Sequence, residues 1–265
     1  MEQRDVAPRE VSRSGLAIGI AVLLLAALGI AGAWWFVTRL QQQERSPEGI
    51  AESILRDRKA APFFEALRDN YPREFADYTA LLSKRVREGA TREQIRSESL
   101  TWMGAVTDRH LGEFVQAPHG DLNLYRQMEI QLVETMQQED VRLCGQYVMG
   151  TLKPGAHYPP RTAERLIETA AAWITASAGG RDHPANRKIP KGEVSEADAV
   201  ALVTEMRRVG ASQADLDVWT DPARLARARP EQQCAIGLHL LNGIVELPHE
   251  RSDRVTGWLV SQKSR

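Results

Sequence analysis

Residues 15–37 read GLAIGIAVLLLAALGIAGAWWFV, a run of twenty-three residues without a charged side chain. As an α-helix this run would be roughly 34 Å long, enough to cross the ~30 Å hydrocarbon core of a bilayer. Trp34 and Trp35 are typical of the membrane interface, and Arg39 beyond them can reach the head groups. The run therefore predicts a single transmembrane anchor after a short cytoplasmic leader over residues 1–14.

A cleaved secretory signal peptide is the alternative interpretation of the same run. Ala31, Gly32 and Ala33 fit the small-x-small pattern of a cleavage site. However, the apolar run is longer than that of a signal peptide, and two tryptophans would directly follow the cut. An uncleaved anchor is favoured, and a secreted helical protein remains the alternative. A lipoprotein is excluded, because the first cysteine is Cys144.

Basic residues on the two sides of the run give a small bias in orientation. Arg4, Arg9 and Arg13 precede it, whereas Arg39 and Arg45 follow it. A lone N-terminal anchor with a short leader usually keeps that leader in the cytoplasm. Arginine greatly outnumbers lysine, as is typical of a GC-rich bacterial genome. We therefore expect an inner-membrane protein whose C-terminal part lies in the periplasm.

Small residues within the run suggest a second role for it. Gly15 and Gly19 form one small-x-x-x-small pair, and Gly29 and Ala33 form another on nearly the same helical face. Such pairs let two membrane helices approach closely. They make a homodimer through this face possible.

The rest of the chain shows helical spacing of apolar residues and no convincing pair of alternating strands, so the predicted class is all-α. We expect a transmembrane helix followed by a multi-helix soluble domain with helical regions over residues 46–180 and 194–265, the second packed on the first. Residues 181–193 are the best candidate for a boundary or a mobile loop. Helix starts are predicted from N-capping residues, namely Ser46, Thr91, Asp121, Ser195, Ser212 and Asp221.

Four expectations concern how far individual helices run. Apolar spacing from Ile50 continues beyond Pro62, and a single helix is expected from Thr91 to about Val115. A helix over 161–178 is expected to stop at Gly179 and Gly180, since glycine commonly ends helices. The helix capped by Asp121 is expected to be the longest of the soluble part.

Composition argues against nucleic acid as a partner. The chain has 34 basic and 35 acidic side chains and a formal net charge of −1. No single-sign field is available to steer an anionic polymer.

Cys144 and Cys234 are the two cysteines of the chain. In the periplasm an even pair is expected to be oxidised, so we predict a disulfide between them. Two separate buried thiols are the alternative.

Few residues point to chemistry. The six histidines are scattered without metal-binding spacing, and no P-loop, dinucleotide-binding glycines or nucleophile elbow occurs. The sequence predicts no catalytic, cofactor-binding or metal-ligating residue. Glu98-Ser99 resembles the catalytic Glu-Ser start of lytic transglycosylases, which implies a buried glutamate acting as acid and then base on peptidoglycan. The Gly-Leu-Met-Gln stretch expected downstream is absent, since residues 102–105 read WMGA.

These observations favour a membrane-anchored helical protein that acts as a periplasmic interaction or adaptor module with a protein partner. A peptidoglycan-acting enzyme of the lytic-transglycosylase type is the alternative function.

Overall fold

A computed structural model of the chain describes residues 46–152, 158–190 and 194–263. These residues form thirteen helices and no strand, which confirms the all-α class for this part of the chain. The helices are α2 (Pro47–Arg56), α3 (Ala61–Asn70), α4 (Pro72–Arg87), α5 (Arg92–Arg109), α6 (Leu111–Phe114), α7 (His119–Glu139), α8 (Val141–Val148), α9 (Pro160–Asp182), α10 (Glu196–Arg208), α11 (Gln213–Trp219), α12 (Pro222–Arg227), α13 (Pro230–Glu246) and α14 (His249–Lys263).

The predicted span over residues 15–37 lies outside the described residues, as do Gly15, Gly19, Gly29 and Ala33. None of the helices in the described ranges is both long enough and apolar enough to cross a membrane.

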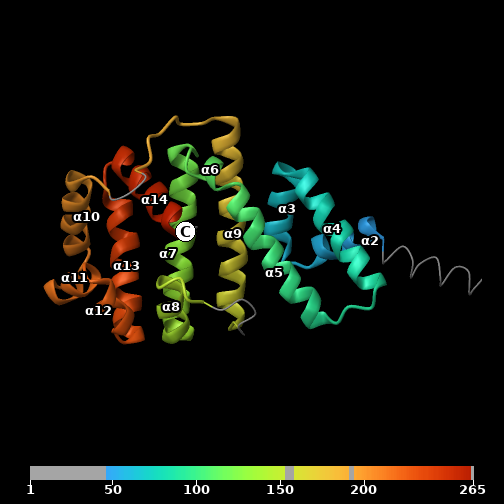
Figure 1. Cartoon of the computed structure of the whole chain (residues 1–265), viewed down its shortest axis with the longest axis horizontal. Coiled ribbons are helices and arrows are strands. Elements are labelled where there is room, and N and C mark those ends of the chain that lie inside the picture. The colour runs from blue at the N-terminus through green and yellow to red at the C-terminus, as the bar shows by residue number, and fades with distance from the viewer. Residues whose placement is uncertain (1–45, 153–157, 191–193, 264–265) are drawn as a thin grey trace, which may run out of the picture.

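Four helices, α10, α13, α7 and α9, stand side by side in that order across the molecule (Figure 1). Helices α2 to α5 lie at one end, where α3 packs on α9, and α10 to α12 lie at the other. Helix α14 contacts α6, α7 and α13, which brings the C-terminal helix to the middle of the molecule. The last helix therefore completes the central packing instead of adding to an edge.

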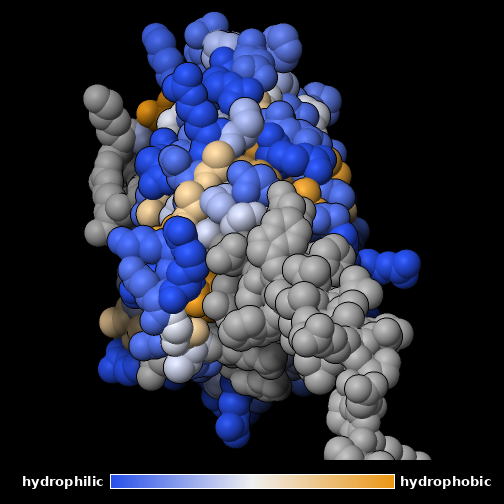
Figure 2. Space-filling view, turned by 90° about the vertical axis from the view of Figure 1, so that its right-hand side faces the viewer, coloured by the Kyte–Doolittle hydropathy of each residue, from blue (hydrophilic) through white to orange (hydrophobic). Residues whose placement is uncertain are grey.

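An aromatic cluster forms the core of the end that carries α2 to α5. Phe64 stacks on Tyr78 with ring centroids 5.1 Å apart, and Trp102 lies 4.6 Å from Tyr78. Helix α2 has no fully buried residue and covers this cluster with partly buried apolar side chains such as Ile50 and Ile54. Figure 2 shows this end of the molecule, where a narrow band of hydrophobic residues runs between hydrophilic ones.

Most of the predicted caps are confirmed. Ser46, Thr91, Ser195, Ser212 and Asp221 each accept a hydrogen bond from a backbone N–H in the first turn of the following helix. Two of these caps, at Thr91 and Ser212, are capping boxes.

The prediction that Asp121 caps a helix is wrong, because α7 already begins at His119. Pro118 occupies the cap position of α7 without a side-chain hydrogen bond. Helix α9, with 23 residues, is also longer than α7, with 21.

The helix expected to end at Gly179 and Gly180 instead continues to Asp182. Both glycines are sites of close packing: a Cβ at Gly180 would collide with the backbone oxygen of Glu113, and one at Gly179 with the carboxylate of Asp121. These residues lack side chains because other backbone and side-chain atoms occupy the space, and not because the helix ends there.

Two other expected helices are interrupted. The one from Thr91 to Val115 breaks at His110 into α5 and α6, and residues 57–60 separate α2 from α3. Helices α7 and α8 are separated at Asp140, whose carboxylate caps α8. Apolar periodicity does not reveal such breaks, since the flanking helices face the same core.

Candidate functional site

A buried ion-pair cluster lies where α14 closes onto α7. The side chain of Arg126, on α7, is 2% exposed, and its Nη1 donates to Asp253 Oδ1 at 3.0 Å and to Thr256 Oγ1 at 3.1 Å. Asp253 and Thr256 are one turn apart on α14. Burial lowers the pKa of the Arg126 guanidinium, although Asp253 opposes that effect.

Asp253 also holds the segment between α9 and α10. Arg187 Nη2 donates to Asp253 Oδ2 at 2.8 Å, and Arg187 Nη1 donates to the backbone oxygens of Val115 and Ala117. His119 Nδ1 lies 2.9 Å from Asp253 Oδ1. One buried carboxylate is thus shared by two guanidinium groups, which leaves this set of three formally positive by one charge. Contacts of Arg187 hold in place part of the segment that was interpreted as a boundary or mobile loop.

A cavity of about 110 Å³ adjoins Arg126 between α7, α8, α13 and α14. Apolar side chains make up most of its wall. Its lining residues are Arg126, Glu129, Val133, Tyr147, Val148, Gly237, Leu240, Leu241, Ile244, Thr256, Leu259 and Val260. Tyr147 donates its hydroxyl to Glu129 at 3.1 Å, and burial raises the pKa of Tyr147 well above its usual value. The tyrosine therefore remains a hydrogen-bond donor at any physiological pH.

Two nitrogens of Arg126, Nε and Nη2, are buried and have no hydrogen-bond partner among the described residues. Buried donors of a charged group are rarely left unpaired, because the loss of hydration costs ~1–3 kcal/mol or more for each such group. Both atoms are fully buried, so neither offers a surface to the adjacent cavity.

A second polar cluster joins the α3–α4 junction to α6. Tyr71 donates its hydroxyl to Glu113 Oε2 at 2.6 Å, and His110 Nδ1 lies 2.9 Å from the same oxygen. Arg181 from α9 covers the Tyr71 ring at 4.8 Å. Burial and the neighbouring Glu113 raise the pKa of Tyr71, so this hydroxyl stays protonated and ties the two parts together.

Glu98, the candidate acid suggested by the resemblance to lytic transglycosylases, lies on α5. Its carboxylate pairs with Arg85, whose Nε donates to Oε2 at 2.7 Å. This hydrogen bond lowers the pKa of Glu98, whereas a general acid at neutral pH needs a raised pKa. Ser99 donates to the backbone oxygen of Ile95 and accepts from Tyr78. Neither residue has the environment which that role requires.

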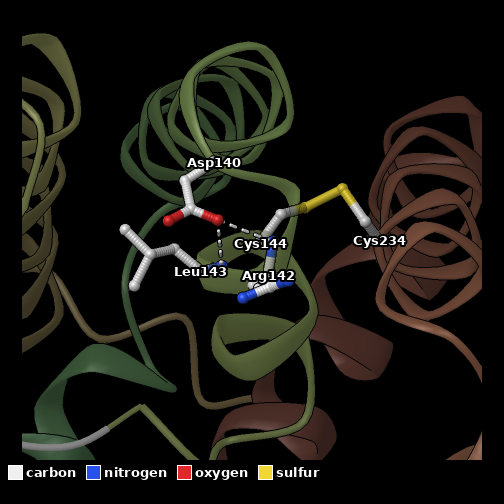
Figure 3. Close-up of a disulfide and its surroundings, with 5 residues drawn as sticks. All are labelled: Asp140, Arg142, Leu143, Cys144 and Cys234. Carbon is white, nitrogen blue, oxygen red and sulfur yellow. Dashed lines mark hydrogen bonds between the residues drawn. A yellow bond between two sulfur atoms is a disulfide. The ribbon is translucent and has the colours of Figure 1, made fainter.

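The predicted disulfide is present: Cys144 on α8 is bonded to Cys234 on α13, with Cα atoms 5.3 Å apart (Figure 3). Asp140 caps the first turn of α8 by accepting from the N–H groups of Arg142 and Leu143, and so fixes the helix that presents Cys144. Both cysteines are completely buried beside Leu132, Val133 and Met136 of α7. The alternative of two separate thiols is therefore incorrect.

Metal ligands do not gather in the described ranges, where no group of three or more His, Cys, Asp or Glu residues could hold an ion. His119 and His249 lie at the first residues of α7 and α14 and stack with ring centroids 3.8 Å apart. His157 lies outside the described residues.

Arg126 and Asp253 were not identified from the sequence. One signal was available: in a helix, Arg126 and Glu129 occupy the same face as the apolar Leu122 and Val133. Charged residues at core-facing positions indicate a buried polar site. No protein-family model, curated protein or solved structure matches this chain.

Proposed function

We propose that the protein is a single-pass, membrane-anchored interaction module of the cell envelope, with its helical part on the periplasmic side. The observation that carries this proposal is the Cys144–Cys234 disulfide, because such bonds form and persist mainly in oxidising compartments. The apolar run over residues 15–37 supplies the anchor.

Ion pairing supports an interaction role over acid–base catalysis. Asp253 is shared by Arg126 and Arg187, and Glu98 is held by Arg85. Carboxylates that are held by guanidinium groups in this way act as structural partners.

Two experiments test the anchor and its orientation. Intact mass of the protein from its native membrane should equal that of the whole chain, and a mature chain beginning at Trp34 would contradict the anchor. For orientation, a single added cysteine at Val200, which is 61% exposed, should react with a membrane-impermeant maleimide in intact spheroplasts. A cysteine at Ser12 should react only after lysis, and the wild-type chain, with both cysteines bonded, serves as the unlabelled control. The reverse pattern would place the helical part in the cytoplasm.

A further inference from the structure

The cavity between α7, α8, α13 and α14 lies between two cross-links of these helices. On one side, the Cys144–Cys234 disulfide joins α8 to α13. On the other side, Arg126 on α7 donates to Thr256 on α14 at 3.1 Å. Both cross-links restrict the shifts of the helices that would close the cavity. The space of about 110 Å³ is therefore preformed, as ligand sites usually are.

The wall of this cavity reaches from the core to the surface. Val133, Ile244 and Val260 line it and are buried, whereas Leu241 and Leu259 line it and are partly exposed. A small molecule can thus reach the buried part between α13 and α14 while the helices stay folded. Transfer of an apolar molecule from water to such a wall is favourable.

The charges in the wall balance, which disfavours an ion as the ligand. Arg126 and Glu129 carry opposite formal charges, and both line the cavity. Each is already engaged, since Arg126 donates to Asp253 and Glu129 accepts from Tyr147. An ion entering the cavity would lose its hydration without gaining a counter-charge, and that loss is costly. A neutral molecule avoids this cost.

The size of the cavity suits a ligand of a single ring or a short chain. Its volume of about 110 Å³ is somewhat below that of an engineered apolar cavity of ~150 Å³ that stays dry and binds benzene. A water molecule would need at least ~2 polar partners there. The wall is mainly apolar, so it favours a hydrophobic molecule over water.

We propose that this cavity binds a small, uncharged hydrophobic molecule of ~6 carbon atoms, held by apolar contacts. Binding involves no covalent step and no ion pair. The inference goes beyond the proposed function, because it rests on the cavity alone and not on the anchor or the compartment.

The test uses the full chain in phosphatidylcholine nanodiscs, with isotope-labelled Ile, Leu and Val methyl groups and benzene as the probe. Free benzene is measured in the aqueous phase, because the lipid also takes it up. The methyl resonances of Val133, Leu241 and Ile244 should shift saturably, with a dissociation constant on the order of 1 mM, as suits a ligand of this size. Ile174 of α9, which is fully buried in the aromatic cluster, should not shift.

Charge is tested with two molecules of the same shape. Toluene is neutral, whereas N-methylpyridinium carries a positive charge. Toluene should shift the same methyl resonances as benzene. N-methylpyridinium should bind at least ~10-fold more weakly than toluene, because its charge would be desolvated without a partner.

Variants that fill the cavity test its location. Leu241→Phe and Leu259→Phe enlarge a lining side chain on α13 and on α14, and each should abolish the shifts of Val133 and Ile244. Leu124→Phe makes the same change at a half-exposed position of α7 and should leave binding unchanged. Thermal melts establish which variants fold.

Three results would overturn the proposal. One is the absence of saturable shifts at Val133, Leu241 and Ile244 in the wild type, or equal shifts at Ile174. Another is binding of N-methylpyridinium as tight as that of toluene. The third is unchanged binding in a folded Leu241→Phe or Leu259→Phe variant. If neither of these variants folds, the wild-type titrations alone decide.

Discussion

Asp253 stands out among the single residues, because it faces Arg126, Arg187 and His119 at once. Removing its charge would leave two guanidinium groups without a carboxylate, one of them buried. Asp253→Asn should therefore lower the free energy of unfolding by ~3–5 kcal/mol. Urea unfolding followed by circular dichroism measures this.

The matched control for Asp253 is Asp69, which pairs with Arg68 on the surface. Asp69→Asn should leave stability unchanged within error, since exposed ion pairs contribute little. A loss below about 1 kcal/mol for Asp253→Asn would show that the cluster is not held by this carboxylate.

Asp198 should make stability depend on pH in acid. Arg254 donates to both of its oxygens, at 2.9 and 3.0 Å, and lowers the pKa of this buried carboxyl. A folded-state pKa below the unfolded value adds stability that is complete above the unfolded pKa of ~3.9 and is lost as pH falls through the folded pKa.

Asp198→Asn should thus cost roughly 1–3 kcal/mol at pH 7 and progressively less below pH ~4. Thermal melts of the variant and of the wild type at pH 7, 5, 4 and 3 would show this convergence. Parallel stability curves across that range would contradict the assigned role of the Arg254–Asp198 pair.

The sequence predicts a contact where the chemistry of the residues alone identifies both partners. The disulfide followed from an even cysteine count, whereas the Arg126–Asp253 pair joins residues 127 positions apart on helices whose packing no local pattern specifies. The exposure of Val200 could not be predicted from a local pattern either. It belongs to an apolar helical pattern, and yet it is 61% exposed.

Among the elements, α9 depends on the absence of a side chain at Gly180. A methyl group there would meet the backbone oxygen of Glu113, and backbone cannot move aside cheaply. Gly180→Ala should therefore destabilise the fold by at least ~2 kcal/mol, as overpacking does, despite the better helix propensity of alanine.

Gly104 is the control for Gly180. It lies inside α5, and a Cβ there would meet nothing within 4 Å. Gly104→Ala should stabilise the protein by up to ~1 kcal/mol. Thermal unfolding of the two variants should shift in opposite directions, and a shift of the same sign in both would refute the close packing of α9 on α6.

These elements also show which helix boundaries can be predicted from the sequence. Ser46, Thr91 and Ser195 cap their helices through contacts within three residues, so the local sequence contains the whole signal. Gly180 is a residue type typical of helix ends, but here its lack of a side chain makes room for a contact with α6, about 65 residues away. Such a residue can be interpreted only once the packing is known.

At the scale of the whole molecule, the disulfide joins two helices that are 90 residues apart in sequence. Its loss in a Cys144→Ser, Cys234→Ser double variant should reduce stability by about 4 kcal/mol through the greater freedom of the unfolded chain. Melting of the variant beside the wild type, each with and without reductant, checks this. Reductant should lower only the wild-type transition, and equal stability of the two oxidised proteins would contradict the expected effect.

The placement of α14 at the centre has a consequence for synthesis. Because Arg126 finds Asp253 only after α14 has been made, the central packing cannot be completed before residue 253 has been synthesised. At ~5–20 residues per second, Cys144 also waits several seconds or more before Cys234 appears. With two cysteines in the whole chain, however, a wrong intramolecular bond cannot form. Maturation therefore needs an oxidant, but it needs no isomerase to correct the pairing.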